Sequence, residues 1–118
     1  MTMTRNLKIE MDYVKDLLSI LRKNHYRKGD VFKQRTLLGQ PHFGQPGYIG
    51  EYYVTCLDTL EAMERRGLIT PIDKVYTWEN GVEVTMENMH AGEVFLTITY
   101  KVTIDNFEDY IDALSMIL

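Results

Sequence analysis

EVFLTITYKVTI, residues 93–104, is the segment that decides the fold class of this chain. Its even-numbered positions, from Val94 to Ile104, are apolar or aromatic, whereas most of its odd-numbered positions are polar. A period of two residues places these two sets on opposite faces of a β-sheet. A slip of one residue in the pairing would expose the whole apolar set, so the register is well specified. The segment therefore predicts a strand with one buried face and one solvent-exposed face.

A hairpin is predicted immediately before this strand. Asn80–Gly81 is the strongest short hairpin signal in the chain, and it suits a type I′ turn, in which both central residues have positive φ. The flanking segments 74–79 and 82–88 alternate as strands do. Together with residues 93–104 they predict a three-stranded antiparallel meander.

Three longer helices are predicted from apolar residues spaced three and four apart. The first covers residues 7–24. The second covers residues 50–66 and ends at Arg65, Arg66 and Gly67, which is a typical helix end. The third begins near Asp105, where Asp105 and Glu108 resemble a capping box.

A short helix is also predicted over residues 31–38, with Asp30 as its N-cap and Gly39 as its end. The resulting fold class is α+β, with three N-terminal helices, a three-stranded antiparallel meander and a C-terminal helix on one sheet face. A length of 118 residues is that of a single domain, residues 1–118.

Residues 39–50, GQPHFGQPGYIG, connect the short helix to the next one, and six of these twelve residues are Gly or Pro. Long loops of this kind are enriched in functional segments. His42, Phe43 and Tyr48 are therefore candidate contacts for a partner. The alternative is that Phe43 and Tyr48 hold the loop against its own domain.

Several function classes receive no support from the sequence. The His and Cys residues are not at metal-ligand spacing, and no glycine motif for nucleotide phosphates is present, so we expect no metal and no cofactor. Cys56 lies on the buried face of its predicted helix, where a thiol behaves as a small apolar side chain. No set of catalytic residues emerges, and we expect a protein that is not an enzyme.

The cellular compartment is expected to be the cytoplasm. The first residues, MTMTRNLK, lack the apolar core of a signal peptide. A single cysteine fits a reducing compartment. No apolar run reaches the ~18 residues that a membrane-spanning helix needs, so no membrane contact is expected.

Charge is divided unequally along the chain. Residues 1–50 hold nine basic and four acidic residues, a net charge of +5, whereas residues 51–118 hold four basic and thirteen acidic residues, a net charge of −9. The densest basic stretch has the composition of a phosphate-contacting surface, and its members are Arg22, Lys23, Arg27, Lys28, Lys33 and Arg35. An ordinary solvated helix end has the same composition.

The segment YVTCLDTLEAMERRGLI, residues 53–69, resembles the third helix of winged helix-turn-helix domains, as found in small uncharacterised phage or prophage proteins. The helices at residues 7–24 and 31–38 would then be the first two, and the hairpin at Asn80–Gly81 would be the wing. The resemblance covers residues 7–90 and leaves residues 93–118 as an added strand and helix.

The resemblance implies a regulator that binds DNA with Arg65 and Arg66 on its recognition helix. Asp58 and Glu61 on the same helix depart from this pattern, because they would face phosphates. The first hypothesis is accordingly a non-catalytic DNA-binding regulator. The alternative is an acidic protein-interaction module, either a phage-encoded inhibitor or a component of an assembly. The candidate partners are thus DNA, a host or phage protein, and a second copy of the chain contacted through the C-terminal helix.

Overall fold

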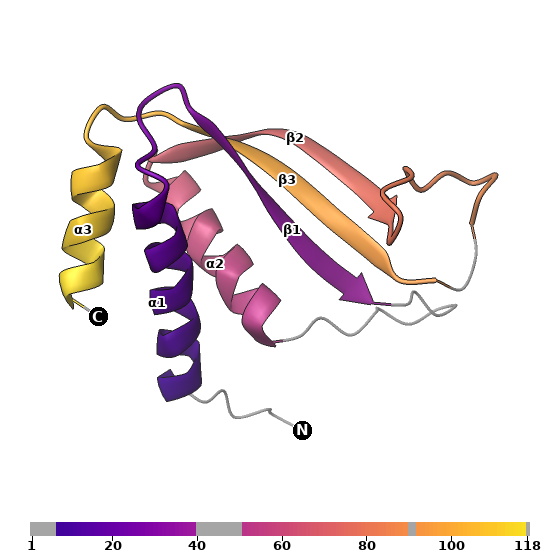
Figure 1. Cartoon of the computed structure of the whole chain (residues 1–118), viewed down its shortest axis with the longest axis horizontal. Helices are drawn as coiled ribbons and strands as arrows, with labels where there is room; N and C mark the ends of the chain where they lie inside the picture. The colour runs from indigo at the N-terminus through magenta and orange to yellow at the C-terminus, as the bar shows by residue number, and fades with distance from the viewer. Residues whose placement is uncertain (1–6, 40–50, 90–91, 118) are drawn as a thin grey trace.

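The computed structural model describes residues 7–39, 51–89 and 92–117. Three helices lie on one side of a three-stranded antiparallel sheet (Figure 1). The fold is therefore α+β, as expected. The order of the elements along the chain is α1 (Leu7–Lys23), β1 (Val31–Gly39), α2 (Glu51–Arg65), β2 (Ile69–Trp78), β3 (Val94–Val102) and α3 (Phe107–Ile117).

This order contradicts the predicted arrangement of three N-terminal helices followed by a meander. Residues 31–39 form strand β1 instead of a short helix, and β1 pairs with β3 along its length. Phe32 and Thr36 are buried on one face, whereas Lys33 and Arg35 are exposed on the other. The period of two was present in the sequence, but Val31 and the adjacent Leu37 and Leu38 also fit one side of a short helix.

The carboxylate of Asp30 accepts a hydrogen bond from the backbone N–H of Arg27 at 2.8 Å, so it closes the turn before β1 instead of capping a helix. The sheet itself has the order β1-β3-β2, with β3 in the centre. The second helix that the winged-helix resemblance requires is thus a strand over residues 31–38. The helix, glycine and aliphatic pair that carried the resemblance are present.

The hairpin at Asn80–Gly81 exists in a different form from the one expected. The Gly81 N–H donates to the Trp78 carbonyl at 2.9 Å, and the Trp78 N–H donates to the Val82 carbonyl at 2.8 Å. Gly81 has a φ of +87°, but Asn80 does not have a positive φ. These are the features of a three-residue hairpin loop with a left-handed glycine, not of a type I′ turn. The returning segment makes only an isolated bridge between Glu83 and Thr77, so the predicted strand 82–88 is wrong.

Strand β3 confirms the alternation seen in the sequence. Its even-numbered residues face the helices, and Ile98, Tyr100 and Val102 are buried. Tyr100 stacks on Phe32 of β1 with ring centroids 5.5 Å apart, and Phe32 in turn stacks on Tyr26 at 5.1 Å. Burial, followed by the charges of Glu64 and Glu61, raises the pKa of Tyr100 to about 12.

The helices α1 and α2 confirm the predicted ranges 7–24 and 50–66 closely. Their core faces supply most of the helical part of the core, and Phe107 and Ile111 of α3 complete it. Cys56 is completely buried, as expected for a core thiol. Helix α3 begins at Phe107, and Glu108 contacts His25 of the chain after α1.

Helix α2 ends in a Schellman motif. The N–H of Leu68 donates to the Met63 carbonyl at 3.1 Å, and the N–H of Gly67 donates to the Glu64 carbonyl at 2.9 Å. Gly67 has a φ of +76°, which glycine adopts at little cost. Leu68 and Ile69 are then buried as the chain enters β2. This junction fixes where Arg65 and Arg66 leave the helix.

Candidate functional site

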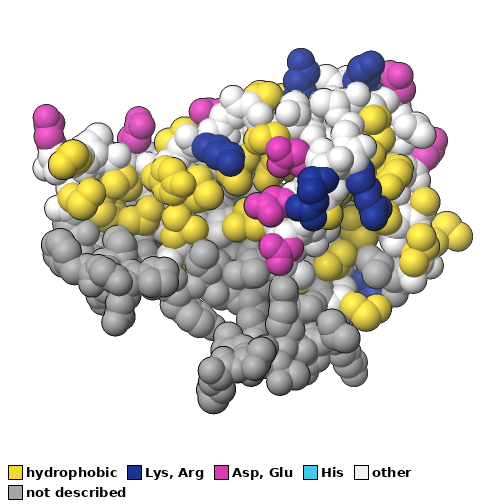
Figure 2. Space-filling view, turned by 180° about the vertical axis from the view of Figure 1, so that it is seen from behind, with side chains coloured by type: hydrophobic (Ala, Val, Ile, Leu, Met, Phe, Trp, Pro, Cys, Tyr) yellow, Lys and Arg dark blue, Asp and Glu magenta, His cyan; other side chains and the backbone are white. Residues whose placement is uncertain are grey.

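The eight cations predicted to hold nucleic acid belong to three parts of the fold. They fall into three groups: the end of α1 with its following turn, the face of β1, and the end of α2. In the space-filling view, Lys and Arg side chains lie in separate groups with acidic and hydrophobic side chains between them (Figure 2). On the face seen in Figure 2, the positive charge is therefore interrupted.

The first group is partly neutralised by helix α3. The Nε atom of Arg22 lies 2.8 Å from Oδ1 of Asp112, and Nζ of Lys28 lies 3.9 Å from Oδ1 of Asp105. Lys23 and Arg27 are exposed beside these pairs. These contacts join basic residues of the N-terminal part of the chain to acidic residues of its C-terminal part.

The group at the end of α2 is split between two environments. Arg65 is exposed in the last turn of the helix. Arg66 is also exposed, but its side chain lines a pocket between the helices. Asp58 and Glu61 are exposed on the same helix. An arginine pair flanked by carboxylates gives no uniform positive surface on α2.

The β1 group lies on the sheet face that the helices do not cover. Lys33 pairs across with Thr99, and Arg35 pairs with Thr97. Lys101 of β3 lies on the same face, one diagonal step from Lys33. We call Lys33, Arg35 and Lys101 the basic sheet face. None of the three forms an ion pair with a carboxylate of the described residues.

Arg35 is held in place on this face. Its guanidinium carbon lies 3.7 Å from the ring centroid of Phe95, and its Nη2 donates to the Glu79 carbonyl at 3.4 Å. A guanidinium over an aromatic ring is a cation–π contact. Asp73 of β2 faces the same side, opposite Thr99. The face thus carries three positive charges and one negative charge.

The connection between β2 and β3 forms a second candidate site. We call residues 79–89 the acidic loop. Asn88 organises this loop: its Oδ1 accepts from Trp78 Nε1 at 2.9 Å and from the Thr85 N–H at 2.8 Å, and its Nδ2 donates to the Glu83 carbonyl at 2.7 Å. Trp78 is buried at the base of the loop. The loop is therefore folded onto the end of the sheet.

The surface of the acidic loop combines negative charge with exposed apolar side chains. Glu79, Glu83 and Glu87 are exposed, and Glu93 follows just before β3. Met86 is 90% exposed and Met89 is 64% exposed. At the corresponding end of the molecule, Figure 2 shows acidic and hydrophobic side chains without Lys or Arg among the described ones.

Sequence reasoning missed this site although a signal was available. The 26 residues between Lys74 and Lys101 contain no Lys or Arg and four Glu. That stretch was predicted to form the wing and the strand after it, and Glu79, Glu83 and Glu87 on such a wing do not suit a DNA backbone. The burial of Trp78 and the side-chain contacts of Asn88 could not be found from spacing.

His42, Phe43 and Tyr48, the predicted partner contacts, lie outside the described residues. In residues 7–39, 51–89 and 92–117, no group of three His, Cys, Asp or Glu side chains is placed to hold a metal ion. No helix within these ranges combines the length and the apolar character needed to cross a membrane. Comparisons with family models, with curated proteins and with solved structures give no match for this chain.

Proposed function

We propose that this chain is a non-catalytic protein-interaction domain that binds a basic partner surface with its acidic loop. The observation that carries the proposal is the coincidence of Met86 and Met89 with Glu83 and Glu87 on one folded loop. Methionine is enriched at protein interfaces because its flexible, polarisable side chain fits varied apolar surfaces.

Preorganisation supports this function. Binding by a disordered segment costs conformational entropy, whereas a loop that is already folded loses less. The contacts of Asn88 with Trp78, Thr85 and Glu83 hold the acidic loop before a partner arrives. The loop thus presents its exposed carboxylates and methionines on a backbone that is already folded.

Charge determines the kind of partner. The acidic loop carries three Glu and no Lys or Arg, so it attracts a surface rich in Lys and Arg and repels phosphates. An apolar depression at the centre of the partner's basic surface would receive Met86. The same charge argues against a nucleic acid at this end of the sheet.

Site-specific cross-linking tests the proposal. A photoreactive side chain replaces Met86, and the chain is irradiated in the cells that produce it. We expect one discrete adduct with a protein whose contacted surface is basic. The adduct should disappear when Glu83→Gln and Glu87→Gln are added, because both carboxylates are exposed and contribute charge and not packing.

Met116 provides a matched control. It is 88% exposed, almost the same as Met86, but lies at the end of α3. The photoreactive group at position 116 should not give the same adduct. An identical adduct from both positions, or no discrete adduct from position 86, contradicts the proposal.

Nucleic-acid binding is a second candidate, favoured by one observation. Lys33, Arg35 and Lys101 are exposed together on the uncovered sheet face, and Phe95 beside Arg35 offers a ring. Aromatic rings and cations on an exposed surface are the elements that hold single strands. Retention of a fluorescent oligonucleotide at low salt, lost in the Lys33→Gln and Lys101→Gln variant, would support it. Equal retention by Arg65→Gln and Arg66→Gln variants would leave α2 without a role, whereas no retention by the original chain rejects nucleic acid.

A further inference from the structure

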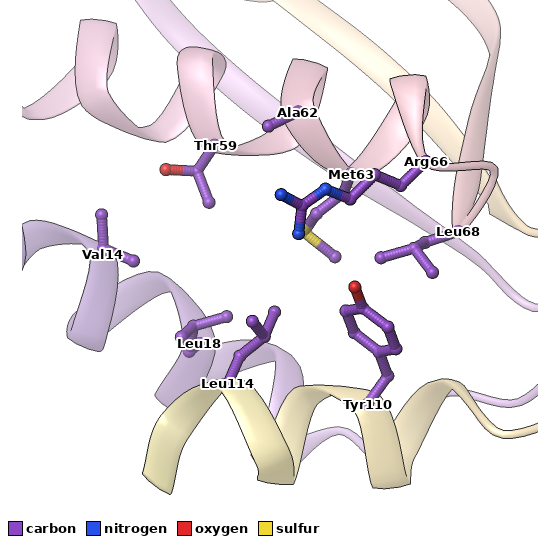
Figure 3. Close-up of a pocket in the computed structure, with 9 residues that line it drawn as sticks. All are labelled: Val14, Leu18, Thr59, Ala62, Met63, Arg66, Leu68, Tyr110 and Leu114. Carbon is purple, nitrogen blue, oxygen red and sulfur yellow. The ribbon is translucent and has the colours of Figure 1, made fainter. Parts of the chain in front are cut away.

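A pocket lies between the three helices, on the side of the sheet opposite the basic sheet face (Figure 3). Its volume is about 160 Å³. Most of its lining is aliphatic, with Val14 and Leu18 from α1, Leu68 from the start of the chain after α2, and Leu114 from α3. Helix α1 packs against both α2 and α3, and the pocket lies where these helices meet.

Besides Thr59, whose hydroxyl donates to the Thr55 carbonyl at 2.8 Å, two polar side chains reach this apolar space. Figure 3 shows the guanidinium of Arg66 extending over the pocket from the turn after α2, and the hydroxyl of Tyr110 pointing into it from α3. Arg66 is the one charged residue among the lining side chains. It forms no ion pair with a carboxylate of the described residues.

Helical spacing explains why Arg66, and not its neighbour, has this position: it follows Thr59, Ala62 and Met63 on one side of α2, and its N–H still donates to the Ala62 carbonyl at 3.3 Å. Gly67 turns the chain in the left-handed conformation, and Leu68 is buried against the helices. Arg66 therefore stands at the pocket edge, while Arg65 does not line the pocket. The two arginines share charge, size and exposure but differ in what they face.

The size of the pocket and its polar side chains indicate the class of ligand that it can bind. An apolar cavity of about 150 Å³ accommodates a six-carbon ligand such as benzene. A guanidinium binds a carboxylate through two parallel hydrogen bonds, and a phenol hydroxyl can donate a third. We propose that the pocket binds a small monocarboxylate with an aliphatic chain, of about six carbon atoms in all. The chain would contact the leucines and Val14, and the carboxylate would face Arg66 and Tyr110.

This site is separate from the acidic loop, so it goes beyond the proposed function and does not depend on it. The loop extends from the far end of β2, whereas the pocket lies between the helices. Failure of either proposal leaves the other unaffected.

An NMR titration of the full chain with hexanoate tests the site. We expect saturable shifts of the backbone amides around Ala62 and Leu114, with a Kd of about 1 mM for a ligand of this size. Hexanamide has the same shape without the charge and should bind about ten times more weakly. Arg66→Gln should weaken hexanoate by about tenfold and change hexanamide little.

Two further variants make the result decisive. Arg65→Gln is the matched control, and it should bind hexanoate as the original chain does. Ala62→Leu should block both ligands, because the added side chain enters the pocket while the amide spectrum stays that of the folded chain. Absence of saturable shifts, equal affinity for hexanoate and hexanamide, or equal losses in Arg65→Gln and Arg66→Gln would overturn the proposal.

Discussion

The two faces of the central sheet differ in what their side chains contact. On the face toward the helices, Ile98, Tyr100 and Val102 are buried among apolar neighbours. On the other face, Lys101, Lys33 and Arg35 are exposed, although Thr97 is half-buried and Thr99 is buried. Adjacent residues of one strand therefore serve stability and surface chemistry respectively.

Substitutions on the two faces of the sheet should therefore have different effects. A change on the helix-covered face removes buried contacts and lowers the free energy of unfolding. A change on the uncovered face alters charge at the surface and leaves the free energy of unfolding nearly constant. Predictions about stability therefore concern the first face, and predictions about binding concern the second face and the acidic loop.

Trp78→Ala should give the largest loss. Trp78 is buried at the end of β2, and replacing such a residue by alanine costs about 3–5 kcal/mol. Tyr76 lies on the same face of the same strand but is 49% exposed, so Tyr76→Ala should cost less than about 1 kcal/mol. Urea denaturation of both variants measures the difference. Equal losses would show that the acidic loop does not shield Trp78 from solvent.

Alkaline pH should cause the next largest loss in the free energy of unfolding, through Tyr100 on the helix-covered face. The pKa of Tyr100 is raised to about 12 in the folded state, against about 10 in the unfolded chain. Between these values the unfolded chain binds fewer protons, so the free energy of unfolding falls as pH rises from 10 to 12, by about 2 kcal/mol in total. Well below pH 10 Tyr100 contributes no slope, because it is protonated in both states.

Tyr100→Phe isolates this contribution. Phenylalanine cannot ionise, so the variant should lose less stability than the original chain between pH 10 and 12, while lysines titrate in both. Urea denaturation at pH 9 and pH 11 measures the two slopes. Identical slopes would mean that Tyr100 ionises as readily in the folded chain as in the unfolded one.

Sequence periodicity predicted the elements whose pattern has a single interpretation. Residues 93–104 alternate over a long span, and helices α1 and α2 have a continuous apolar stripe ending at recognisable signals such as Gly67. Residues 31–38 were assigned wrongly because eight residues fit both periods. Pairing with β3 stabilises the strand conformation of these residues, because β3 has β2 on one side and β1 on the other.

The candidate sites were predicted less well than the fold because charge in a sequence does not show which charges meet. Arg22 and Lys28 belong to the densest basic stretch, yet their partners Asp112 and Asp105 are more than 70 residues away. The acidic loop depends on Asn88, a residue with no special spacing. The pocket depends on the packing of three helices, which brings Leu18, Arg66 and Leu114 together from distant parts of the chain.

The smallest expected effect separates paired cations from unpaired ones. Arg22 is paired with Asp112 across the helix layer at 2.8 Å, whereas Lys33 stands on the uncovered face. A half-exposed ion pair contributes about 0.5 kcal/mol, so Arg22→Gln should lower the free energy of unfolding by that amount and Lys33→Gln should leave it unchanged. High salt should reduce the Arg22→Gln effect, because it screens surface charges.

A double-mutant cycle of Arg22→Gln with Asp112→Asn gives the coupling directly, by urea denaturation at low and high salt. Coupling near zero at low salt would place Arg22 among the unpaired cations together with Lys33. The basic surface available to a polyanion would then extend from the uncovered sheet face to the end of α1, and the nucleic-acid candidate would gain on the acidic loop. Coupling that is present at low salt and disappears at high salt keeps the two groups apart, because Asp112 of α3 then neutralises Arg22, whereas Lys33 of β1 has no carboxylate partner among the described residues.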